Sequence, residues 1–143
     1  MQAGGRLLLV ARQGLRSYLV TKPRRSILII EDDESVRSLL QRALRESYDV
    51  EMVVDGTTAV ERVERDPVPD LVICDVMLPG VDGFSVARLA KASRWARVPF
   101  IFLTARTTPR DVIEGIQSGA RHYLTKPFKL KDLQDRVAKI LRA

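Results

Sequence analysis

The chain has 143 residues, of which 45% are hydrophobic and 29% are charged. This composition is ordinary for a globular protein and suits one domain with a sizeable core. Its one cysteine, Cys74, excludes an internal disulfide, and no cluster of Cys and His has the spacing of a metal site. We therefore expect a reducing, cytoplasmic setting.

The formal net charge of +6 belongs to the start of the chain. Residues 1–25 hold six basic side chains and no acidic one, so the basic residues of the remainder balance its 18 acidic residues. The six are Arg6, Arg12, Arg16, Lys22, Arg24 and Arg25. Residues 26–143 show no basic stripe, so we expect no DNA binding by that part of the chain.

Residues 1–25 read as an N-terminal extension, followed by one domain over residues 26–143. The apolar runs of the extension are shorter than the roughly 20 residues of a membrane helix. A secretory signal fits poorly, because Arg12 and Arg16 follow the first apolar run and no small-residue cleavage site is evident. The alternatives are an uninformative tail, a packing or dimerising helix, and a basic amphipathic segment for anionic membranes or nucleic acid.

From residue 26 onward, short apolar runs alternate with segments whose apolar residues recur at helical spacing. The apolar runs predict strands at residues 27–30, 50–54, 71–74, 100–103 and 122–124. Apolar residues at 3.6-residue spacing predict helices within residues 36–44, 59–63, 86–90, 112–116 and 130–141. Right-handed crossovers then predict an α/β fold, a flavodoxin-like doubly wound parallel sheet with strand order 2-1-3-4-5.

Charged side chains stand at the ends of three predicted strands. Asp75 closes the third strand before a Pro/Gly turn, Glu31 and Asp32 follow the first, and Lys126 follows the fifth. In this fold the binding crevice lies at the carboxyl ends of strands one and three. The pattern indicates a carboxylate site that handles phosphate.

Four linked motifs extend this pattern: Glu31-Asp32-Asp33, Asp75 with Pro79-Gly80 and Asp82-Gly83, Thr104-Ala105, and Lys126-Pro127-Phe128. Over residues 26–143 the chain resembles the receiver domain of bacterial two-component response regulators. The four motifs occur in the order and spacing of that family, whereas the N-terminal extension lies outside the resemblance.

The resemblance implies that Asp75 accepts a phosphoryl group from a sensor histidine kinase or a phosphotransfer protein. Glu31 and Asp32 match the acidic pair that holds Mg²⁺ together with Asp75, and the main-chain carbonyl of Met77 would complete the protein ligands. A carboxylate is a weak nucleophile and an incoming phosphoryl group is anionic, so a cation is needed between them. Mg²⁺ suits such oxygen ligands and retains several waters.

The resemblance also implies that Thr104 and Lys126 contact the phosphoryl oxygens. Thr104 would then move toward the phosphoryl group while Tyr123 turns from exposed to buried. This switch would reshape the face of the fourth helix, the fifth strand and the fifth helix, which would bind a downstream protein or form a homodimer.

Other residues have simpler interpretations. Asp33 and Glu34 are expected to start a helix and not to bind metal. The Lys126-Pro127 bond is a candidate cis peptide, because such bonds are almost confined to X-Pro. Trp95 stands beside arginines in a predicted loop and is a candidate for an exposed contact surface.

The leading hypothesis is a phosphorylation switch that catalyses only its own phosphotransfer and slow dephosphorylation. A pseudo-receiver that binds partners without phosphorylation is the alternative, and the intact acceptor and its partners disfavour it. A phosphatase would need a second Asp two residues after the nucleophile, where this chain has Met77. The stand-alone receiver and the piece of a longer regulator both stay open, and the kinase and the pathway are not predicted.

Overall fold

The computed structural model describes residues 23–105, 110, 113, 115, 117 and 122–142. The predicted N-terminal extension therefore lies outside the described residues, apart from residues 23–25. The predicted fourth helix also lies largely outside them. Of the predicted residues 112–116, Ile113 and Gly115 are described and helical, as are the nearby Arg110 and Gln117.

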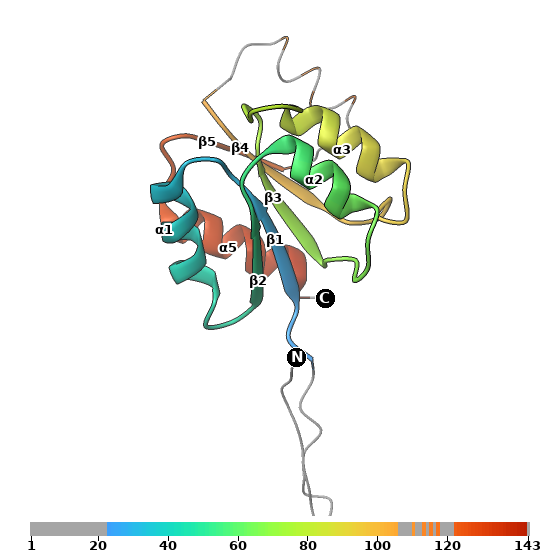
Figure 1. Ribbon diagram of the computed structural model, residues 1–143. Coiled ribbons are helices and arrows are strands. Elements are labelled where there is room, and N and C mark those ends of the chain that lie inside the picture. Colours follow the sequence, from blue (N-terminus) through green and yellow to red (C-terminus); the bar gives the residue numbers. More distant parts are fainter. Residues whose placement is uncertain are drawn as a thin grey trace, which may run out of the picture.

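A single parallel sheet forms the centre of the molecule (Figure 1). Its strands are β1 (Ser26–Ile30), β2 (Asp49–Val53), β3 (Leu71–Asp75), β4 (Phe100–Thr104) and β5 (His122–Thr125). The strand order is β2-β1-β3-β4-β5, and every neighbouring pair is parallel. The predicted topology is confirmed, and the strand boundaries differ from the predicted ones by one residue at most.

Helices cover both faces of the sheet. In Figure 1, α1 (Glu34–Leu44) and α5 (Leu130–Leu141) lie on one face, and α2 (Gly56–Val63) and α3 (Gly83–Lys91) lie on the other. Each face has its own apolar core, because successive side chains of a strand point to opposite sides. In β1, Ile27 and Ile29 belong to the α1/α5 core, whereas Leu28 and Ile30 belong to the α2/α3 core.

Three of the described helices begin with an aspartate that caps the first turn. The side chain of Asp33 accepts a hydrogen bond from the N–H of Val36 at 3.1 Å. Asp55 and Asp82 cap α2 and α3 in the same way. Such caps satisfy backbone N–H groups that have no partner inside the helix. The interpretation of Asp33 as a helix-start residue is thus confirmed.

The prediction that Trp95 lies on an exposed contact surface is wrong. Its side chain is buried, with 1% exposed, in the core between the sheet and α3. The guanidinium of Arg62, itself buried, lies 5.1 Å from the centre of the indole ring, a cation–π contact. Arg62 also donates to Glu51 at 2.8 Å and to the carbonyl of Pro67 at 2.7 Å. These bonds stabilise the buried charge of Arg62. The guanidinium of Arg62 in turn covers the indole ring of Trp95 from within the domain.

Candidate functional site

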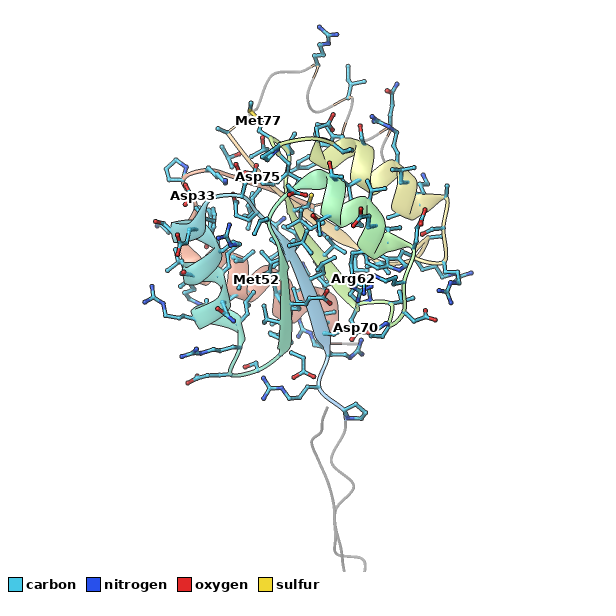
Figure 2. The ribbon with its side chains drawn as sticks, in the orientation of Figure 1. Asp33, Met52, Arg62, Asp70, Asp75 and Met77 are labelled. Carbon is cyan, nitrogen blue, oxygen red and sulfur yellow. The ribbon has the colours of Figure 1, made fainter. Side chains whose placement is uncertain are left out.

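Three carboxylates predicted from the sequence meet at one edge of the sheet. Asp75 is the last residue of β3 and Glu31 directly follows β1, and these two strands are neighbours. One ligand oxygen each from Glu31, Asp32 and Asp75 lie within 4.8 Å of one another. Asp75 and Glu31 are buried, whereas Asp32 is exposed. Figure 2 shows Asp75 and Met77 at this end of the sheet, with Asp70 toward the opposite end.

Lys126 connects two of these carboxylates. Its Nζ lies 3.0 Å from Oε1 of Glu31 and 3.0 Å from Oδ2 of Asp75. The residue directly follows β5, and its peptide bond to Pro127 is cis, as predicted. The long side chain therefore reaches across β4 to the end of β3, which lies on the far side of β4 in the sheet.

Thr104 lies between Asp75 and Lys126 in the order of the strands. It ends β4, is 3% exposed, and its carbonyl accepts a hydrogen bond from the N–H of Lys126 at 2.9 Å. Leu103, the residue before it, is in register with Asp75. The ends of β3, β4 and β5 thus bring the predicted carboxylate, hydroxyl and amine to one edge.

Burial makes the charges of this site interdependent. The pKa of Glu31 is raised to about 7, first by burial and further by the charge of Asp75, against hydrogen bonds from the Asp33 N–H and Lys126. Burial alone would lower the pKa of Lys126, but its hydrogen bonds to Asp75 and Glu31 more than offset this, so that pKa is raised. The hydrogen bond from Lys126 therefore does not offset the cost of burying the ionised carboxylate of Glu31.

The donor set fits a small divalent cation. Carboxylate and carbonyl oxygens are the ligands that Mg²⁺ prefers. The pKa of Glu31 is raised mainly by burial and further by the charge of Asp75, and a bound divalent cation would stabilise the ionised forms of both carboxylates. Met77 lies beside Asp75, since its N–H donates to Oδ1 of that residue at 3.2 Å. Its carbonyl as a ligand stays a prediction.

The loop after Asp75 is held against the start of α2. The N–H of Gly56 donates to the carbonyl of Pro79 at 3.0 Å. Gly80 has a φ of +82°, which glycine adopts readily, and Oγ1 of Thr57 lies 2.4 Å from the position that a Cβ of residue 80 would take. The Pro/Gly turn noted in the sequence thus fixes the backbone that carries Met77.

Tyr123, the predicted switch residue, is partly buried in β5. Its ring stacks on Phe102 with ring centres 5.7 Å apart, and its hydroxyl occupies the space where a Cβ of Gly115 would lie. That hydroxyl is buried without a hydrogen-bond partner among the residues that the structure describes, and burial raises its pKa. The movement of Tyr123 on phosphorylation stays a prediction.

Sequence reasoning missed one residue beside the acidic pair. Arg37 of α1 donates from Nη1 to the carbonyl oxygens of Glu31, at 3.0 Å, and Asp32, at 2.9 Å. An arginine on a helix is ordinarily a solvent-exposed charge, so its type gave no signal. Only its spacing, five and six residues after the two acids, could have pointed to the contact.

Comparison with known proteins agrees with this geometry. The family model of the response regulator receiver domain matches residues 27–138. Over 120 residues the chain is 44% identical to the DNA-binding response regulator MtrA of Mycobacterium tuberculosis strain H37Rv, covering 83% of this chain and 51% of that protein. The chain thus spans about half the length of this curated relative.

Solved structures give the same result. A putative response regulator from Chloroflexus aurantiacus is 33% identical with a TM-score of 0.76, covering 85% of this chain and all of that one. The receiver domain of sensor histidine kinase PA1611 from Pseudomonas aeruginosa, solved with a magnesium ion coordinated in its active site cleft, is 34% identical. Its TM-score is 0.76, again covering 85% of this chain and all of that one.

The fold and the site define a phosphorylation-switch domain of two-component signalling. The chain belongs to the response regulator receiver family, as its motifs predicted. Receiver domains bind Mg²⁺ at an acidic pocket, and this chain has the acidic cluster. Among the described helices, none is long and apolar enough to cross a membrane.

Proposed function

We propose that Asp75 accepts a phosphoryl group from the phosphohistidine of a sensor histidine kinase or phosphotransfer protein, in a reaction that requires Mg²⁺. The contact of Lys126 with both Glu31 and Asp75, at 3.0 Å each, is the observation that carries this proposal. A lysine that serves only in a structural ion pair needs one carboxylate as its partner. A lysine that gathers two buried carboxylates beside a third acid is a reason to expect chemistry at this site.

Glu31, Asp32 and Asp75 would hold Mg²⁺ through their carboxylates, and Met77 through its main-chain carbonyl. The magnesium ion in the cleft of the PA1611 receiver domain supports this assignment. When bound, Mg²⁺ supplies the positive charge that lets an anionic carboxylate approach an anionic phosphoryl group.

The chain's own residues would act in the following way. A carboxylate oxygen of Asp75 attacks the phosphorus, the P–N bond of the donor breaks, and its electron pair returns to the donor imidazole. Lys126 leaves Asp75 for a transferred phosphoryl oxygen, and the hydroxyl of Thr104 donates to another. The product is an aspartyl phosphate, which the same domain hydrolyses slowly.

Output would follow from Thr104 and Tyr123. Withdrawal of Thr104 toward the phosphoryl group opens space behind it, and Tyr123 fills this space. The face built by the fourth helix, β5 and α5 then binds a downstream protein or a second copy of the chain. The relative MtrA is named a DNA-binding regulator, so DNA binding by a longer protein containing this domain is the other form of output.

Intact-protein mass after incubation with acetyl phosphate tests the proposal, with and without Mg²⁺, on the wild type and on Asp75→Asn. We expect one phosphoryl adduct that requires both Mg²⁺ and Asp75. Beryllofluoride, a stable mimic of the phosphoryl group, serves as a control for rapid hydrolysis. A folded protein that gains neither adduct nor mimic would instead be a pseudo-receiver that binds partners unphosphorylated.

A further inference from the structure

The segment that carries the acidic pair belongs to neither β1 nor α1. β1 ends at Ile30 and Asp33 caps α1, so Glu31 and Asp32 lie between the two elements. The N–H of Glu31 donates to Val53 at 3.0 Å, which ties one side of this segment to β2. Among the described residues, no backbone N–H donates to the carbonyls of Glu31 or Asp32.

Arg37 bonds to both of these carbonyls. Its Nη1 lies 3.0 Å from the oxygen of Glu31 and 2.9 Å from that of Asp32. A single donor group that binds two successive carbonyls requires both to point toward α1. Two adjacent peptide planes are thereby fixed, and with them the directions in which the two side chains leave the backbone.

We infer that Arg37 is a positioning residue for the metal ligands, holding the carboxylates of Glu31 and Asp32 in place for a divalent cation. This inference rests on the proposed function. Residues that orient metal ligands typically change metal affinity 10- to 100-fold when they are removed. Arg37 bonds to the backbone carbonyls of the two ligands, so it does not compete with the cation for their carboxylate oxygens.

The charge of Arg37 makes the inference sharply testable. A nearby guanidinium repels a bound cation, so its removal would strengthen Mg²⁺ binding if charge alone mattered. Loss of the two hydrogen bonds would weaken Mg²⁺ binding. The two effects have opposite signs, and the measured direction distinguishes them.

The experiment is calorimetric titration of MgCl₂ into the wild type, Arg37→Ala, Arg37→Met and Arg42→Ala. Arg37→Met retains the aliphatic stem and replaces the Ala variant if that one does not fold. Arg42→Ala removes an exposed positive charge from the last turn of the same helix. We expect about tenfold weaker binding in the Arg37 variants and no change in Arg42→Ala. Equal or tighter binding in a folded Arg37 variant would overturn the inference.

Urea unfolding in EDTA and in Mg²⁺ separates positioning from general stability. A ligand that binds only the folded state stabilises it according to its affinity. A purely structural role would lower stability equally in both conditions, and this result would also overturn the inference. If Arg37 positions the ligands, Mg²⁺ should raise the free energy of unfolding by less in the Arg37 variants than in the wild type. If the wild type itself binds no Mg²⁺, the proposed function fails, whereas wild-type binding unaffected by Arg37→Ala rejects this inference alone.

Discussion

The ammonium of Lys126 lies 3.0 Å from Oδ2 of Asp75, so the proposed phosphoacceptor is already paired with an internal cation. The same ammonium bonds Glu31 at 3.0 Å. An incoming metal therefore shares two carboxylates with a lysine whose pKa is raised by those contacts. This relationship shapes how each site residue should respond to substitution.

Lys126→Ala should bind Mg²⁺ at least as tightly as the wild type, because a competing cation is removed. It should still accept a phosphoryl group from acetyl phosphate. Phosphorylation should then fail to change the structure of β5 and α5. Lys126 directly follows β5, and without its amine the phosphoryl group has no contact with this part of the chain. Titration of Mg²⁺ and amide chemical shifts with beryllofluoride measure these steps, and wild-type shift changes in α5 would contradict the expectation.

Asp75→Asn should abolish the phosphoryl adduct and keep the fold. The substitution preserves shape, and Lys126 keeps Glu31 as a partner. The free energy of unfolding without metal should change by no more than about 3 kcal/mol, the upper value for one hydrogen bond to a charged group. Intact mass and urea unfolding give the two results, and a stable adduct on the Asn variant would refute the assignment.

Asp32 and Asp33 are adjacent acids with different expected roles. Asp32→Ala should lose Mg²⁺ binding and retain stability in EDTA, because its side chain is exposed. Asp33→Ala should retain Mg²⁺ binding and lose about 1 kcal/mol of stability, because it caps α1. Each variant is the control for the other. Unchanged metal affinity in Asp32→Ala would exclude it as a ligand.

Mg²⁺ affinity should fall as the pH is lowered through about 7, the raised pKa of Glu31. A metal ligand must be ionised, and the protonated fraction of Glu31 grows below this pKa. Without metal, the free energy of unfolding should depend on pH in the opposite direction. The raised pKa of Glu31 stabilises the folded state at low pH, and this stabilisation is lost as the pH rises through about 7. Glu31→Gln should flatten both profiles. A pH-independent wild-type affinity between pH 6 and 8 would reject this expectation.

Tyr123→Phe should raise the free energy of unfolding by about 1 kcal/mol, since no described residue hydrogen-bonds to the buried hydroxyl of Tyr123. The ring itself should remain stacked on Phe102. Urea unfolding of both proteins in EDTA measures the difference. Destabilisation by the Phe variant would mean that the hydroxyl is satisfied in solution.

The sequence was sufficient for the sheet and for the location of the candidate site. Buried parallel strands are continuous apolar runs, so β1, β3 and β4 were recognisable by residue type. Asp75 and Lys126 were recognisable because they stand where such runs end. Trp95 was placed wrongly, since neighbouring arginines in the chain suggested a surface while Arg62, distant in the chain, covers the ring.

By itself, the sequence determined the order of the elements and the chemical groups at the strand ends, because both follow from local periodicity and from the rule that parallel strands end on one edge. Only the tertiary structure decided which groups pair. Lys126 meets Glu31 across 95 residues of chain, and Arg37 meets two carbonyls whose direction no residue type encodes. Burial, which raises the pKa of Glu31, is likewise a property of the packed domain. Pairing and desolvation depend on distances between elements, and these exist only once the sheet has formed.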